Sequence, residues 1–121
     1  MARTALAVQS IPQFGAALDD VVFTAADAAN NHEFINDGRT MLLMKNDSGG
    51  PLTADVIGVA NTRTANRTSA ETMTAGASDI CIAGPFEQSA FNQALDGGGS
   101  GVFVDLSTDT SLSFAVVKFF K

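Results

Sequence analysis

The apolar residues of this chain come in short runs, and turn residues interrupt these runs roughly every 8–12 residues. No segment keeps an apolar period of 3.6 residues, so we expect helix only as single turns, around 86–93 and near 25–31. This pattern is typical of an all-β chain folded as an antiparallel sandwich or small barrel. The predicted strands cover 20–25, 32–36, 40–46, 52–61, 71–76, 78–84, 102–107 and 112–120.

The segment 40–46, with sequence TMLLMKN, is apolar at successive positions. Side chains alternate between the two faces of a strand, so this segment presents apolar residues on both faces. It is therefore predicted to be a central strand that is covered on both sides.

The first 18 residues differ in charge from the rest of the chain. They contain Arg3 and no acidic residue, whereas all 13 acids lie from Asp19 onward. We therefore expect an extended N-terminal arm over residues 1–18, followed by a β-sandwich domain over 19–121. The arm lacks the uninterrupted apolar stretch of a signal peptide, and no run reaches the ~18 apolar residues of a membrane span.

An apolar arm can add a strand to the sheet edge of a neighbouring chain. Val8, Ile11 and Phe14 are the side chains expected to anchor the arm on such a partner. The alternative is a terminus without fixed structure.

Overall charge and aromatic content exclude some classes of partner. The formal net charge is −6, which disfavours binding to a phosphate backbone, so no nucleic acid is expected as a partner. The chain has nine Phe but no Tyr and no Trp. Binding faces for sugars commonly use the polar tips of Tyr and Trp, so a carbohydrate-binding module is disfavoured.

The residues that could carry chemistry are few. His32 is the single histidine and Cys81 the single cysteine, and the sequence gives no reason to place them together. Cys81 is expected to be a small buried residue on a strand. The sequence therefore predicts no enzyme activity, no cofactor and no metal centre. A calcium site built from Asp19, Asp27, Asn30 or Asp37 is a weak alternative, because their spacing matches no known calcium loop.

The stretch IAGPFEQSAFNQ, residues 82–93, does not alternate like its surroundings. Pro85 has no backbone N–H, so the strand before it must end there. Phe86 and Phe91 are expected to fold back as a plug that closes one end of the sandwich. A ligand clamp is the alternative, but no cluster of charged residues accompanies the two rings.

Three short elements occur in a characteristic order: GRTMLLMKNDSG at 38–49, GPF…FNQ at 84–93, and VFVDLS at 102–107. Over residues 32–120 the chain resembles a family of small tailed-bacteriophage structural proteins, several of which look like capsid decoration, or cement, proteins. The resemblance implies a jelly-roll-like β-sandwich without catalytic residues, placed on the outer capsid surface of the virion. It also implies the major capsid protein as partner and self-association as a homotrimer. The lack of a long apolar run separately predicts no contact with a membrane.

Such a protein stabilises the expanded shell by bridging major capsid subunits. Two alternatives remain open from the sequence. One is another virion part, such as a head–tail connector, a tail module or a fibre module. The other is a β-sandwich that binds a small ligand.

Overall fold

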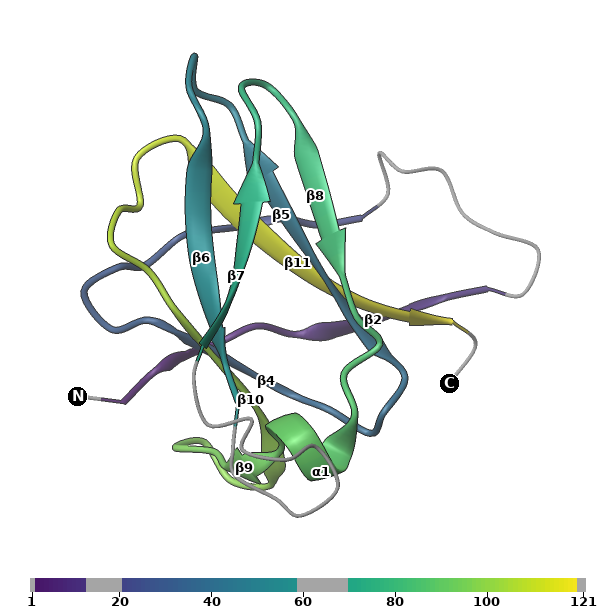
Figure 1. The fold of residues 1–121 in the computed structure, drawn as a ribbon. Coiled ribbons are helices and arrows are strands. Elements are labelled where there is room, and N and C mark those ends of the chain that lie inside the picture. Colours follow the sequence, from purple (N-terminus) through teal and green to yellow (C-terminus); the bar gives the residue numbers. More distant parts are fainter. Residues whose placement is uncertain (1, 13–20, 59–69, 120–121) are drawn as a thin grey trace.

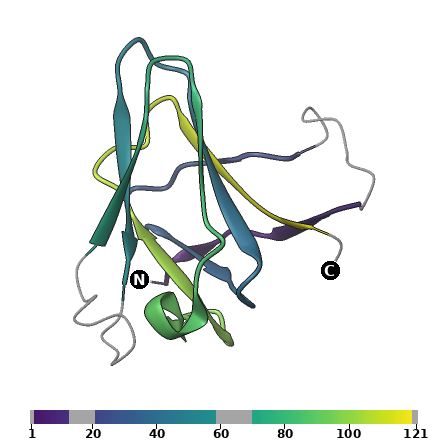
Figure 2. The same cartoon turned by 45° about the vertical axis from the view of Figure 1, so that its right-hand side comes forward.

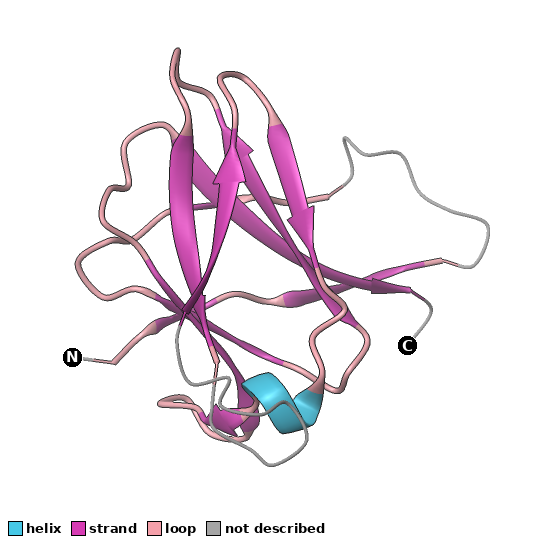
Figure 3. Ribbon diagram, viewed as in Figure 1, coloured by secondary structure: helices cyan, strands magenta, loops and turns pink. Residues whose placement is uncertain are grey.

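The computed structural model describes residues 2–12, 21–58 and 70–119. In these residues the chain forms strands joined by turns, with one helical turn (Figure 3). The strands are β1 (Thr4–Ala5), β2 (Val8–Ile11), β3 (Thr24–Ala25), β4 (His32–Ile35), β5 (Thr40–Asn46), β6 (Leu52–Ile57), β7 (Ala70–Ala75), β8 (Ile80–Ala83), β9 (Gln93–Ala94), β10 (Ser100–Asp105) and β11 (Leu112–Phe119), and the helical turn is α1 (Gln88–Phe91). The predicted all-β class is confirmed.

Two mixed sheets pack face to face as a β-sandwich (Figures 1 and 2). The first sheet has the order β1-β4-β10-β6-β7, with β9 also pairing β10. The second has the order β2-β11-β5-β8, with β3 also pairing β11. The predicted sandwich is therefore confirmed, whereas these strand orders do not establish a jelly roll.

The prediction of wholly antiparallel sheets needs one correction. β1 pairs β4 in parallel, and β2 pairs β11 in parallel, whereas the other strand pairs are antiparallel. Both parallel pairs come from the N-terminal segment, which enters each sheet at its edge.

The core lies between the sheets and follows the alternation of side chains along each strand. Phe34, Leu42, Val102, Phe114 and Val116 are at most 1% exposed and belong to one cluster. A second, smaller apolar cluster contains Leu43, Ala115 and Val117, which lie one residue out of phase with the first on β5 and β11. The expectation that 40–46 is a central strand covered on both faces is therefore confirmed.

The N-terminal segment is part of this sandwich. The backbone N–H of Thr4 donates to Asn31 O and that of Leu6 to Glu33 O, after which the chain crosses to the other sheet and pairs with β11. Leu6 is 3% exposed in the main core. Residues 2–12 of the predicted extended arm therefore lie on this chain's own sheets, where a buried leucine and the parallel strand pairs hold them. Residues 13–18 of the predicted arm lie outside the described residues.

Several strand boundaries also differ from prediction. The segment expected at 20–25 contributes only the two-residue strand β3, and 25–31 forms turns in place of a helical turn. The helical turn expected around 86–93 is present as α1.

Candidate functional site

His32 is fully buried on β4 and both of its ring nitrogens have partners. Nε2 accepts the backbone N–H of Asp27 at 3.0 Å, so Nδ1 carries the proton that is donated to Thr4 O at 3.1 Å. Burial lowers the pKa of His32, since the charged ring would lose its hydration. A neutral ring with both nitrogens engaged fixes the segment around it and is not placed to act as a catalytic base.

Glu33, the next residue, is 1% exposed. Its two carboxylate oxygens accept the backbone N–H groups of Asp96 and Gly97, at 2.8 and 2.9 Å. Glu33 therefore holds the turn after β9 in place, which is a structural task.

The described residues among those considered for calcium have partners within the chain. Within the described residues, no group of three or more metal-binding side chains occurs. Asp27 accepts hydrogen bonds from Thr4 and Asn30, which lower its pKa, the bond from Thr4 most strongly. Asp37 lies elsewhere, 3.0 Å from Nζ of Lys118, which lowers the pKa of Asp37 to about 2. Asp19 lies outside the described residues.

The residues predicted to anchor an arm are used within the chain itself. Val8 packs against the main core and Ile11 against the second cluster, and both are half-buried on β2. Phe14 lies outside the described residues. Val22 lies next to this strand, because its backbone N–H and C=O are hydrogen-bonded to the side-chain amide of Gln9. The side chain of Val22 is 69% exposed.

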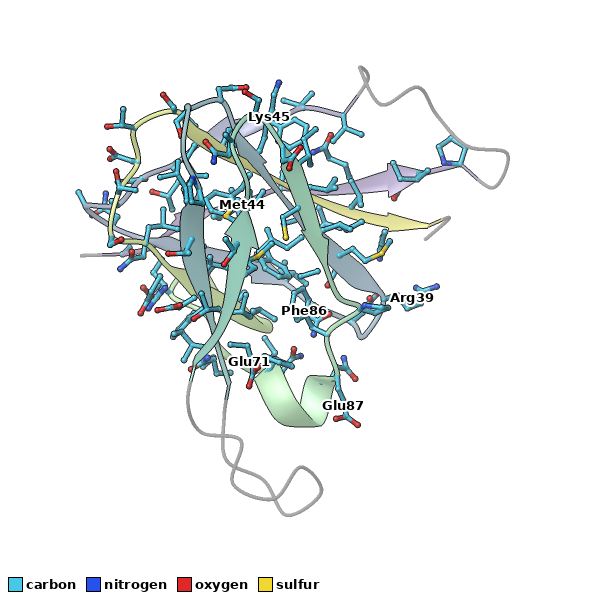
Figure 4. The ribbon with its side chains drawn as sticks, turned by 45° about the horizontal axis from the view of Figure 1, so that its top comes forward. Arg39, Met44, Lys45, Glu71, Phe86 and Glu87 are labelled. Atoms are coloured by element: carbon cyan, nitrogen blue, oxygen red, sulfur yellow. The ribbon has the colours of Figure 1, made fainter. Side chains whose placement is uncertain are left out.

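Pro85, Phe86 and Phe91 lie between β8 and β9. The Gly84–Pro85 peptide is cis, and Gly84 has a φ of 114°, where a side chain is strained and a Cβ would come within 2.9 Å of Thr40 O. Phe86 is 5% exposed, with its ring centroid 5.7 Å from that of Phe34 and 5.3 Å from that of Phe91. Figure 4 shows Phe86 directed into the sandwich, next to α1.

A buried amide fastens this segment to the first sheet. The side-chain Nδ2 of Asn36 donates to Phe86 O at 3.0 Å and to Asn92 Oδ1 at 2.7 Å. Its Oδ1 accepts from Gly38 N and from the Thr40 hydroxyl. From the sequence, Asn36 was expected only as the last residue of the strand 32–36. The sequence feature that could have suggested a partner for Asn36 is a second asparagine, Asn92, in the FNQ element.

A surface cavity of about 310 Å³ lies beside the N-terminal segment. Its lining is mainly apolar and includes Leu6, Val8, Ile35 and Leu95. The charged groups at its edge are already paired, as Lys118 with Asp37 and Glu33 with backbone N–H groups. A small ligand in this cavity would contact mainly apolar surface, because the charged groups at its edge are already paired with other groups of the chain.

Four large apolar side chains of the described residues are well exposed. Ile35 (58%) lies on the first sheet, Ile80 (42%) and Ile82 (58%) lie on the second, and Val22 (69%) lies in the segment before β3. Exposed apolar side chains that are scattered singly are common on protein surfaces, and among these four only Ile80 and Ile82 share a strand. In the described part of the chain, no helix is long and apolar enough to cross a membrane.

Comparisons with protein-family models, with curated proteins and with solved structures found no match to this chain.

Proposed function

We propose that the protein is a phage capsid decoration, or cement, protein that binds the outer capsid surface and stabilises the expanded shell by bridging major capsid subunits. The proposal rests on the family resemblance carried by residues 32–120 and on one structural observation. His32, Glu33 and Asn36 are buried in internal hydrogen bonds, whereas isoleucines of both sheets and Val22, before β3, are exposed.

The arrangement supports adhesion for a physical reason. Exposed apolar side chains gain free energy when a partner covers them, and a standard interface of roughly 1,600 Å² in total can be tight. A protein that binds only the expanded shell shifts the equilibrium toward that shell by mass action. The acidic charge of −6 suits a surface that faces away from packaged DNA. The proposed partners are the major capsid protein and, through a homotrimer, further copies of the chain.

Removing the N-terminal segment is not a clean test, because β1 and β2 belong to the fold. Single substitutions of exposed residues are better. Val22→Asp changes the surface beside β2, and Ile35→Asp changes a comparably exposed apolar site on the other sheet. Both variants should keep the wild-type melting temperature, since neither side chain is buried.

The assay is co-sedimentation of each protein with purified expanded, undecorated capsids. We expect the wild type to bind at many copies per particle. Val22→Asp or Ile35→Asp should bind at least about tenfold more weakly, according to which of the two surfaces contacts the shell. A few copies per particle would favour a connector or tail part instead. Wild-type protein that stays in the supernatant at saturating concentration would overturn the proposal.

A further inference from the structure

β8 is the edge strand of the second sheet, and it pairs only with β5 among the described strands. The backbone N–H of Asn46 donates to Asp79 O at 2.9 Å, which fixes how the following residues alternate. Hydrogen-bonded pairs recur at every second residue of an antiparallel ladder, so Cys81 and Ala83 direct their amide groups toward β5. The amide groups of Ile80 and Ile82 consequently point away from β5, along the free edge.

The side chains of the same two residues are also exposed, 42% for Ile80 and 58% for Ile82. The register places Ile82 opposite Leu43 and Ile80 opposite Lys45, so both isoleucines lie on the outer face of the sheet. Proteins usually protect an edge strand with a charge, a proline or a bulge. β8 has no charged residue and no proline, whereas β7, the edge of the other sheet, carries Glu71.

We propose that β8 pairs with β8 of a second copy of this chain in an antiparallel, two-fold contact. A row of free N–H and C=O groups selects an extended strand as its occupant. In the pairing that uses the outward amide groups of both isoleucines, Ile80 of each copy lies opposite Ile82 of the other. It also sets Asp79 opposite Ala83 of the second copy, so it places no charge directly against a like charge.

This register puts Cys81 on the two-fold axis, directly opposite Cys81 of the second copy. The pair is of the non-hydrogen-bonded kind, in which the Cα atoms are about 4.5 Å apart and side chains approach most closely. Cys81 is a free, half-buried thiol, so it can report the contact without any change to the chain.

The strand that precedes β8, β7, belongs to the other sheet and does not pair with β8. β7 and β8 join at the turn 76–79 and separate below it in both views (Figures 1 and 2). Four residues from each copy cover far less than the roughly 800 Å² per partner of a standard interface. The contact is therefore weak in dilute solution and becomes populated where copies are held close together. It needs no capsid, and its two-fold symmetry makes it separate from the proposed trimer.

The test is oxidation of the purified protein with diamide over a series of protein concentrations, followed by gel electrophoresis without reductant. We expect a disulfide-linked dimer whose rate of formation rises with concentration. Ile82→Lys should slow that rate at least about tenfold, because a lysine would stand in the paired edge. Ile35→Lys is the matched control, since Ile35 is also 58% exposed but lies on the other sheet, and its rate should equal that of the wild type.

A second pair of variants tests the register. In a Cys81→Ser background, Ala83→Cys moves the thiol to a position that faces Asp79 of the second copy, so cross-linking should be lost. Wild-type protein that forms no dimer, Ile82→Lys that cross-links at the wild-type rate, or a thiol at position 83 that cross-links equally well would each overturn the proposal. Because no capsid is present, none of these results bears on capsid binding.

Discussion

Phe86→Ala is the substitution that tests most strongly how residues 84–93 are used. Phe86 is 5% exposed and its ring contacts those of Phe34 and Phe91, so its removal leaves a cavity in the core. Truncation of a buried phenylalanine costs about 3–5 kcal/mol, which combines lost burial with the cavity. We expect a loss of about 4 kcal/mol in the free energy of unfolding, since both aromatic contacts are also lost. For a domain of this size the melting temperature should fall by about 15 °C.

The measurement is urea unfolding followed by far-ultraviolet circular dichroism, because the chain has no Trp or Tyr to report by fluorescence. Phe103→Ala is the control. Phe103 is half-buried on β10 and lies under the guanidinium of Arg3, 4.0 Å from its ring centroid, so its loss should cost about 1–2 kcal/mol. A Phe86→Ala variant no less stable than Phe103→Ala would refute the assignment of Phe86 to the core and would favour a ligand clamp.

Three further predictions follow from the buried polar groups and the ion pairs. Asn36→Ala should lose about 3–4 kcal/mol in urea unfolding, because its side chain makes four hydrogen bonds of roughly 1 kcal/mol each. Folding lowers the pKa of His32 below 6.5, so stability should fall as the pH drops below 6.5, and His32→Phe should show a flatter pH dependence because it has no proton to bind. Asp37 has a pKa of about 2 beside Lys118, so the stability difference between wild type and Asp37→Asn should shrink as the pH falls from 3.8 to 2.

The strands of the sandwich could be predicted because each carries its own local pattern. TMLLMKN is apolar on both faces and forms a central strand. In the run VFVD, alternation places Val102 and Val104 of β10 in the core of the sandwich. Pro85 ends β8 as its missing N–H requires, and α1 follows. In each of these cases neighbours in sequence determine the local structure.

The N-terminal segment and the Asn36 network could not be predicted, because their partners are distant in sequence. Leu6 is buried only because β4 and β11 lie on either side of the crossing, and both come later in the chain. Asn36 is buried because Phe86 and Asn92 contact it across 50 and 56 residues of sequence. A charge boundary at Asp19 indicated a separate arm, but charge composition does not determine strand pairing.

The central claim, that the protein adheres to an expanded shell and stabilises it, is tested most directly by heating expanded capsids with and without saturating protein. We expect a higher melting temperature for the shell with bound protein, and a fixed ratio of bound copies to shell subunits. A shell that melts at the same temperature in both samples, with no bound protein, would contradict it.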